Sequence, residues 1–197
     1  MQIKQKTQTE FILIMACLMS LVALSIDALL PALNIIGIAV GTTSNSDSQL
    51  LITMIFLGLG LGQLVAGPLS DSFGRKPMVY VGFSIFVLAS IVCVYSTSLE
   101  MMIFGRILQG IGLSAPRTLS IAMVRDSYSG DYMARIMSFV VSIFIIVPVI
   151  APTIGKIMLD TFGWQSIFIS QLVFGAFVIF WFYKRQAETL KEIHRKK

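Results

Sequence analysis

Residues 50–94 decide the fold of this chain. They read LLITMIFLGLGLGQLVAGPL at 50–69, SDSFGRKP at 70–77 and MVYVGFSIFVLASIVCV at 78–94. The two outer stretches carry no charged residue, and each is about as long as an α-helix must be to cross the hydrocarbon core of a bilayer. The middle stretch contains Asp71, Arg75 and Lys76. The pattern predicts two membrane-spanning helices joined by a short charged connection.

The remainder of the chain repeats this pattern. Apolar residues make up 56% of the sequence and charged residues 13%, against roughly 45–50% and 25% in an ordinary soluble domain. Six spans of about 20 residues each would occupy about 120 positions. We expect an all-α membrane protein with six transmembrane helices at 11–33, 50–69, 78–94, 99–124, 136–159 and 164–183, an N-terminal tail at 1–10 and a basic tail at 184–197.

The basic residues indicate how these spans are oriented. Apart from Lys156, which is near the fifth connection, those near the spans' ends lie before the first span, in the second and fourth connections and after the last span: Lys4, Lys6, Arg75, Lys76, Arg125, Arg135, Lys184 and Arg185, followed by the lysines and arginine of 191–197. Cytoplasmic loops carry an excess of lysine and arginine. We therefore expect both termini to be cytoplasmic. Basic loops also account for the net charge of +5, so we expect no nucleic-acid partner.

The sequence gives no indication of an enzyme or of a metal site. Cys17 and Cys93 both lie in apolar stretches and have no CxxC or Cys/His spacing around them, so neither a disulfide framework nor a metal centre is indicated. Nucleophile–base arrangements and glycine-rich phosphate loops are absent from the sequence. We expect no cofactor, and an integral-membrane enzyme is a remote alternative.

A short internal repeat suggests how the spans are related. Asp-Ser-Phe-Gly at 71–74 follows the second span, and Asp-Thr-Phe-Gly at 160–163 follows the fifth, on the opposite side of the membrane in the predicted topology. Two three-helix units of opposite topology are typical of secondary transporters. The repeat therefore favours two inverted three-helix repeats.

Two ionisable residues lie inside predicted spans. Asp27 is about 9 Å of helix from the outer end of the first span, and Arg106 lies at a similar depth in the fourth. Charges at this depth cost several kcal/mol and need a functional or structural reason. We expect the two to pair, with the Asp27 carboxyl binding and releasing a proton as its surroundings change. The alternative is a static structural ion pair.

The fourth span has polar and small residues on one helical face: Arg106, Gln109, Gly110, Ser114 and Arg117. Spacings of three and four place them on one side of a helix, where we expect Gln109, Ser114 and Arg117 to line a water-accessible cavity. A close helix contact through small residues is the alternative, and it explains Gly110 and Ser114 well.

The fifth span contains Pro148-Val149-Ile150-Ala151-Pro152-Thr153-Ile154-Gly155. Prolines in a helix remove backbone donors and bend it. This segment could act as the hinge of an outer gate, and a passive kink is an equally good explanation.

Three of these segments together resemble the major facilitator superfamily. Gly67-Pro68-Leu69-Ser70-Asp71-Ser72-Phe73-Gly74-Arg75-Lys76-Pro77 is similar to its signature between helices two and three, and Arg106-Ile107-Leu108-Gln109-Gly110-Ile111-Gly112 to its helix-four signature. The segment 148–155 resembles the helix-five signature of its drug:proton antiporters. Asp27-Ala28-Leu29-Leu30-Pro31-Ala32-Leu33, with Arg125-Asp126 and Gly163-Trp164, is similar to the Bcr/CflA drug-resistance subfamily.

The resemblance implies a role for each matching residue. It places Gly67, Asp71, Gly74, Arg75 and Lys76 in a conformational latch, Asp27 and Arg106 in proton coupling, and Pro148, Pro152 and Gly155 in the antiporter hinge. It also implies efflux of small amphipathic drug-like molecules across a bacterial inner membrane by alternating access, driven by the proton gradient. Two positions depart from the family pattern. Ser72 replaces a basic residue of the latch, and Lys156 replaces a second glycine after Gly155.

The length departs from the family pattern as well. Members of the family have about twelve spans in two six-helix halves, and this sequence contains six. We expect an N-terminal half that works with a second six-helix half or with a second copy of the chain. The alternative is a truncated half that does not transport and instead binds or regulates another transporter.

Overall fold

A computed structural model describes residues 7–42 and 44–190 of the chain, and every regular element in these ranges is helical. The elements are α1 (Gln8–Asp27), a 3₁₀ turn η1 (Leu30–Ala32), α2 (Leu33–Ala39), α3 (Asn45–Phe73), α4 (Arg75–Val94), α5 (Leu99–Ser127), α6 (Gly130–Phe162) and α7 (Gln165–Arg185). Among the described residues, six helical segments are long and apolar enough to span a membrane. The predicted all-α membrane fold is confirmed. Most helices are longer than the apolar stretches from which they were predicted. The positively charged segments 1–6 and 191–197 lie outside the described residues.

The first span is interrupted near one end. Helix α1 ends at Asp27, and the chain continues through η1 into the short helix α2. Pro31 occupies the middle of η1; because proline has no N–H and disfavours helical geometry at the preceding residue, it ends a regular helix here. The predicted span 11–33 is therefore a helix and a broken continuation, with Asp27 at the break.

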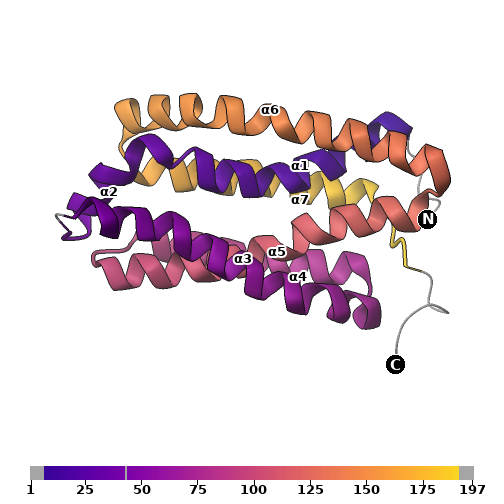
Figure 1. Cartoon of the computed structure of the whole chain (residues 1–197), viewed down its shortest axis with the longest axis horizontal. Coiled ribbons are helices and arrows are strands. Elements are labelled where there is room, and N and C mark those ends of the chain that lie inside the picture. Colours follow the sequence, from indigo (N-terminus) through magenta and orange to yellow (C-terminus); the bar gives the residue numbers. More distant parts are fainter. Residues whose placement is uncertain (1–6, 43, 191–197) are drawn as a thin grey trace.

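The helices form two groups of three, which lie one above the other in Figure 1. One group contains α1, α6 and α7, and the other contains α3, α4 and α5. In the first group α6 packs mainly on α1, and in the second α3 packs mainly on α5. The predicted repeat units are different sets, namely α1, α3 and α4 in the first and α5, α6 and α7 in the second. Replacing each helix by its counterpart in the other unit turns the contact of α1 with α6 into the contact of α5 with α3. The packing thus agrees with two related three-helix units.

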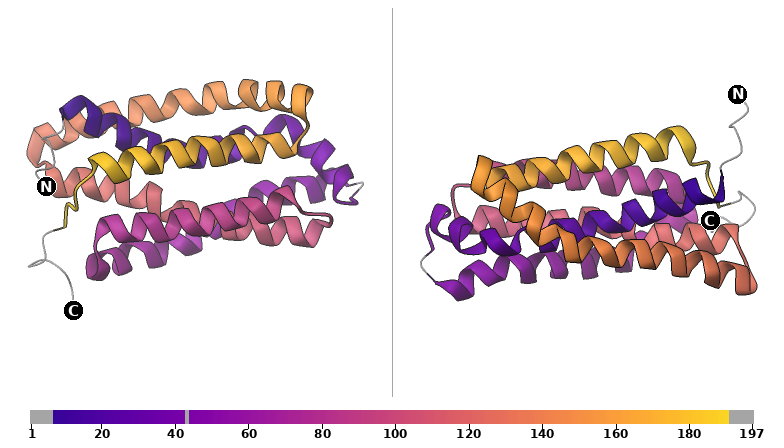
Figure 2. Two further views of the ribbon diagram at one scale, coloured as in Figure 1. Left: turned by 180° about the vertical axis from the view of Figure 1, so that it is seen from behind. Right: turned by 90° about the horizontal axis from the view of Figure 1, so that it is seen from above.

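The two ends of the bundle differ in what they carry. The described ends of the chain, the α3–α4 connection and the α5–α6 connection lie together at one end, which we call the terminal end (Figure 2). The α2–α3, α4–α5 and α6–α7 connections lie at the opposite end. The repeat glycines Gly74 and Gly163 therefore sit at different ends, yet both have a positive φ, +102° and +82°. In each the backbone N–H still closes the preceding helix, on Ser70 and Leu159. Glycine suits both corners because the conformation is strained for other residues.

Polar side chains lie between two apolar clusters in the interior. One cluster lies towards the terminal end and includes Val22, Phe86 and Leu113; the other lies towards the opposite end and includes Leu29 and Phe168. On α1, α4, α5 and α7, each of which contributes to both clusters, buried polar residues lie at the level between them: Ser25, Ser90, Arg106, Gln109 and Gln171. A polar layer at mid-depth is thus shared by these four helices.

Candidate functional site

Asp27 lies where α1 meets the bent helix α6. The residue is half-buried and forms no ion pair with any described residue. Helix α6 approaches the chain closely at Ala28, the residue after Asp27. A Cβ built on Gly155 would lie 2.7 Å from the carbonyl carbon of Ala28 and closer still to its oxygen. A side chain at position 155 would therefore push α6 away from the segment that carries Asp27.

Helix α6 contains both prolines of the predicted hinge, Pro148 and Pro152. Neither can donate the hydrogen bond that would close the preceding turn, and the right-hand view of Figure 2 shows that α6 is bent. The three predicted hinge residues thus act on one helix, and Gly155 brings that helix against the break after α1.

Arg106 is fully buried. Its guanidinium donates three hydrogen bonds, from Nε to the Leu51 carbonyl at 3.1 Å, from one terminal nitrogen to the Ser25 carbonyl at 3.1 Å and from the other to Gln109 Oε1 at 2.6 Å. It also lies over the Phe168 ring, 6.0 Å from the centroid. These contacts differ from the expected pairing, because Arg106 binds the backbone two residues before Asp27 and forms no ion pair with the carboxylate. Carbonyl dipoles and the ring stabilise its charge instead.

Gln109 continues this network away from α1. Its Nε2 donates to Ser90 Oγ at 2.9 Å and approaches Gln171 Oε1 at 3.3 Å. The network therefore joins α1, α3, α4, α5 and α7. Two buried polar atoms beside it, Ser25 Oγ and Gln171 Nε2, have no partner among the described residues.

The cavity predicted along α5 differs from what the structure shows. Gln109 and Ser114 are both buried, and Ser114 borders only a separate, apolar cavity of about 260 Å³ between α3, α4 and α5. Ser114 packs against Gly62 of α3, and a Cβ on Gly110 would collide with the backbone of Ile55. The small residues of α5 therefore allow α5 and α3 to cross closely, which is the alternative given above for this face.

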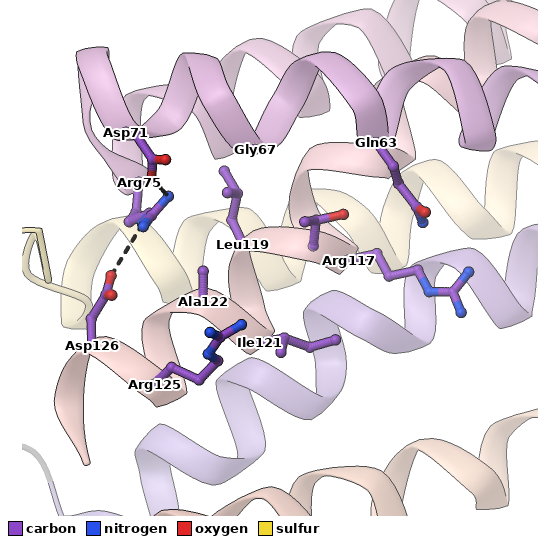
Figure 3. A pocket seen from close by; sticks show the side chains of 11 residues that line it. Gln63, Gly67, Asp71, Arg75, Arg117, Leu119, Ile121, Ala122, Arg125 and Asp126 are labelled. Atoms are coloured by element: carbon purple, nitrogen blue, oxygen red, sulfur yellow. Dashed lines mark hydrogen bonds and ion pairs between the residues drawn. The ribbon is translucent and has the colours of Figure 1, made fainter. Parts of the chain in front are cut away.

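Arg117, which lies two turns beyond Gly110 on α5, does line a polar cavity. The cavity measures about 700 Å³, lies between α3 and α5 towards the terminal end and is shown in Figure 3. Gln63 and Gly67 line it from α3, and Asp71, Arg75, Arg125 and Asp126 complete its polar wall. Of the three residues expected to line a cavity, Arg117 lines this polar one, Ser114 borders the separate apolar one, and Gln109 is buried in the Arg106 network.

Arg75 is the centre of the latch at the terminal end. Its side chain is only 11% exposed and forms ion pairs with Asp71 at 2.7 Å and with Asp126 at 3.1 Å, as the dashed lines in Figure 3 show. It also donates to Ser70 Oγ. The structure thus joins the end of α3, the start of α4 and the end of α5 through one guanidinium.

Sequence reasoning missed Glu188, which completes this latch. The Glu188 carboxylate accepts hydrogen bonds from the backbone N–H groups of Arg75 and Lys76 at 3.1 and 2.9 Å, and from those of Thr189 and Leu190 at 3.0 Å each. An anion at a helix N-terminus satisfies unpaired donors and complements the helix dipole. The sequence marks it only as one of two acidic residues, with Glu192, in the basic segment 184–197. We call Asp71, Arg75, Asp126 and Glu188 the latch cluster.

The other latch and departure positions have clear local roles. Lys76 Nζ donates to the Tyr183 carbonyl at 3.3 Å and lies over the Tyr183 ring, so it ties α4 to α7. Ser72 is exposed. Lys156 forms an ion pair with Asp160 one turn away, at 2.8 Å, with both side chains largely exposed.

A second charged contact joins α1 and α7 at the terminal end. Glu10 accepts two hydrogen bonds from the Arg185 guanidinium, one of them at 2.8 Å, and a third from Trp181 Nε1 at 3.1 Å. A fork of this kind fixes both side chains. It holds the first and last membrane helices together at the terminal end.

Ionisable side chains held at membrane depth, within a bundle of two related three-helix units, are the mark of secondary transporters. That is the class of protein that the fold and the site define. It is a multi-pass membrane protein.

Comparison with known proteins identifies the family. The model of the Major Facilitator Superfamily matches residues 15–197, and the chain belongs to that family. It is 35% identical over 135 residues to the multidrug resistance protein MdtL of Salmonella paratyphi C, covering 68% of this chain and 34% of that protein. It is 30% identical over 142 residues to an uncharacterized transporter of Rickettsia felis, covering 72% of this chain and 35% of the other.

A solved structure shows the same fold. The human organic anion transporter MFSD10 (TETRAN) aligns with a TM-score of 0.72 at 18% identity, over 97% of this chain and 50% of that one. The aligned regions thus take up about a third of the curated relatives' length and half of the solved chain. Two of these relatives are named as transporters and the third as a multidrug resistance protein, and none of the three is named as an enzyme.

Proposed function

We propose that this chain forms one six-helix half of a proton-coupled multidrug efflux transporter in a bacterial inner membrane, with both termini in the cytoplasm. Membership of the family and the similarity to MdtL proteins support transport of drug-like solutes. The second wall of the solute path is a second six-helix half or a second copy of this chain. The transported solutes are small amphipathic molecules.

One observation carries the proton-coupling part of the proposal. Asp27 is a half-buried carboxyl without an ion-pair partner among the described residues, and it sits at the break where Gly155 packs on Ala28. A charge here is costly inside a membrane. Proton uptake removes that charge, so it changes how readily the end of α1 separates from α6. A proton can thereby bias whether the opposite end of the bundle is open.

The remaining groups have supporting roles in alternating access. The Arg106 network holds five helices in one arrangement, so this half can move as a rigid body. The latch cluster holds the terminal end, where its charges must be separated or exchanged for others when that end opens. The proton gradient supplies the energy, and the proposal needs no cofactor.

Transport by a complete protein tests the proposal. The chain is fused to the C-terminal half of an MdtL relative, and solute uptake into inside-out membrane vesicles is followed while a pH gradient is imposed and then collapsed. We expect gradient-dependent uptake, and its loss in Asp27→Asn with unchanged protein levels. Lys156→Gln serves as the matched control at an exposed charge of the same bundle. Undiminished coupled transport by Asp27→Asn would refute the role of Asp27.

The alternative is a six-helix half that does not transport and instead binds or regulates another transporter. Retention of a full-length relative on the affinity-tagged chain, with no gradient-dependent uptake in the fusion, would favour it.

A further inference from the structure

The cavity between α3 and α5 carries two arginines that pair with no carboxylate in the described part of the chain. It is about 700 Å³ in volume, within the range of roughly 300–1,000 Å³ typical of small-molecule sites. Its wall holds three arginines and two aspartates. Both aspartates, Asp71 and Asp126, are paired with Arg75. Arg117 and Arg125 make no side-chain hydrogen bond or ion pair with any described residue.

Arg117 and Arg125 lie at different depths in the cavity. Arg125 is exposed at the end of α5, whereas Arg117 is half-buried eight residues deeper, about 12 Å along the helix axis. Figure 3 shows the Arg117 side chain below Gln63 of α3, with Ile121 between the two arginines, and Leu119 and Ala122 also line the cavity. An unpaired charge at membrane depth is costly, and an anion in the cavity would offset that cost.

We propose that this cavity binds an amphipathic organic anion, a carboxylate or sulfonate whose charged group is held by Arg117. Gln63 donates a further hydrogen bond to the same group, and the apolar body of the ligand lies along Ile121 and Ala122. Arg125 attracts the anion at the mouth of the cavity. An organic cation of the same size would face the two uncompensated arginines and is disfavoured. The inference rests on the proposed function in that the bound anion would be a transported solute, and it narrows the solute class.

Binding to the purified chain tests the site without requiring transport. The probes are fluorescein and rhodamine 6G, which share a xanthene ring system and carry opposite charge. Each is titrated with the full chain in an uncharged detergent, and fluorescence anisotropy is measured. We expect fluorescein to bind at least tenfold more tightly than rhodamine 6G. We also expect Arg117→Gln to weaken fluorescein binding about tenfold, the lower range for losing one hydrogen bond to a charged group.

Three further variants separate a specific site from a general charge effect. Arg135→Gln removes the same charge from an exposed position of α6 outside the cavity, and its affinity should match that of the unsubstituted chain. Arg117→Lys keeps the charge and should retain most of the affinity. Gln63→Glu leaves Arg117 in place but gives it a carboxylate partner, so it should abolish the preference for fluorescein.

The outcomes distinguish this inference from the proposed function. Equal effects of Arg117→Gln and Arg135→Gln, equal affinity for the two dyes, or no fluorescein binding would overturn the anion site. The arginines would then be left to pair with carboxylates of a second half. Fluorescein binding that depends on Arg117, in a fusion without gradient-driven uptake, would uphold the site and defeat the efflux proposal instead.

Discussion

Replacing Gly155 by alanine tests whether the close contact of α6 with α1 is required. The new Cβ would lie 2.7 Å from the carbonyl carbon and 2.9 Å from the Cα of Ala28, whereas carbon atoms in contact are normally about 3.5–4.0 Å apart. The helices must therefore separate by about 1 Å at this crossing. Over-packing of this kind costs about 1–3 kcal/mol.

A matched variant isolates that steric cost. Alanine stabilises a helix over glycine by roughly 0.5–1 kcal/mol wherever its methyl group fits. Gly60 of α3 offers such a position, because a Cβ built there meets nothing within 4 Å. Both variants gain the higher helix propensity of alanine. The difference between their unfolding free energies therefore reports only the cost of the steric overlap at position 155.

The chain contains its own reporter of unfolding. Cys93 is fully buried in the apolar cluster that includes Ala28, so its reaction with a thiol-reactive dye on heating follows the loss of that packing. At roughly 2–4 °C per kcal/mol for a chain of this size, we expect Gly155→Ala to unfold about 2–12 °C below Gly60→Ala. Equal unfolding temperatures would show that α6 can shift without cost, and would refute the argument that Gly155 sets the distance between α6 and the Asp27 segment.

Three other substitutions test the remaining contacts. Arg106→Lys should destabilise the purified chain by about 3 kcal/mol, because an ammonium group cannot reach all three acceptors of the guanidinium; a melting temperature like that of the unsubstituted chain would contradict this. Glu188→Gln should speed hydrogen exchange of the Arg75 amide, through the loss of about 1 kcal/mol of charge–dipole and hydrogen-bond energy, and unchanged protection would count against the capping role. Lys156→Ala should change stability by less than about 0.5 kcal/mol, since its ion pair is exposed, and a larger loss on thermal unfolding would show that Lys156 has a partner besides Asp160.

The sequence predicts the spans well because membrane length and apolar composition are local properties. It does not predict the break after Asp27 as clearly, since the apolar run continues to residue 33 and only Pro31 marks the change. Arg75 and Asp71 fall within one motif, so their pairing could be anticipated from spacing. Glu188 could not be assigned to the same cluster, because more than a hundred residues separate it from Arg75 and only the folded bundle brings α7 beside α4.

The expected pairing of Asp27 with Arg106 shows a limit of reasoning from depth. Position along a helix gives the depth of a side chain, but not the direction in which it points around the axis. Arg106 points into the bundle, where backbone carbonyls of α1 and α3 satisfy it. The structure differs from the cavity expected at Gln109 of α5 for a related reason. Its glycine and serine residues allow α3 to approach so closely that the neighbouring glutamine is buried and does not line a cavity.

The inverted repeat gives a physical reason for the two ends of the bundle to behave differently. Asp71 and Asp160 occupy equivalent places, each three residues before a glycine with positive φ. Asp71 pairs with Arg75, which lies beyond that glycine on the next helix, so the ion pair ties α3 to α4. Asp160 pairs with Lys156, which lies on its own helix. The ion pair of Asp160 therefore does not join α6 to α7, and their corner is joined instead by a neutral hydrogen bond from Ser166 Oγ to the Met158 carbonyl at 3.0 Å. The same repeat thus supplies an ion pair between neighbouring helices at the terminal end but, among the described residues, none at the equivalent α6–α7 corner of the end where Asp27 lies.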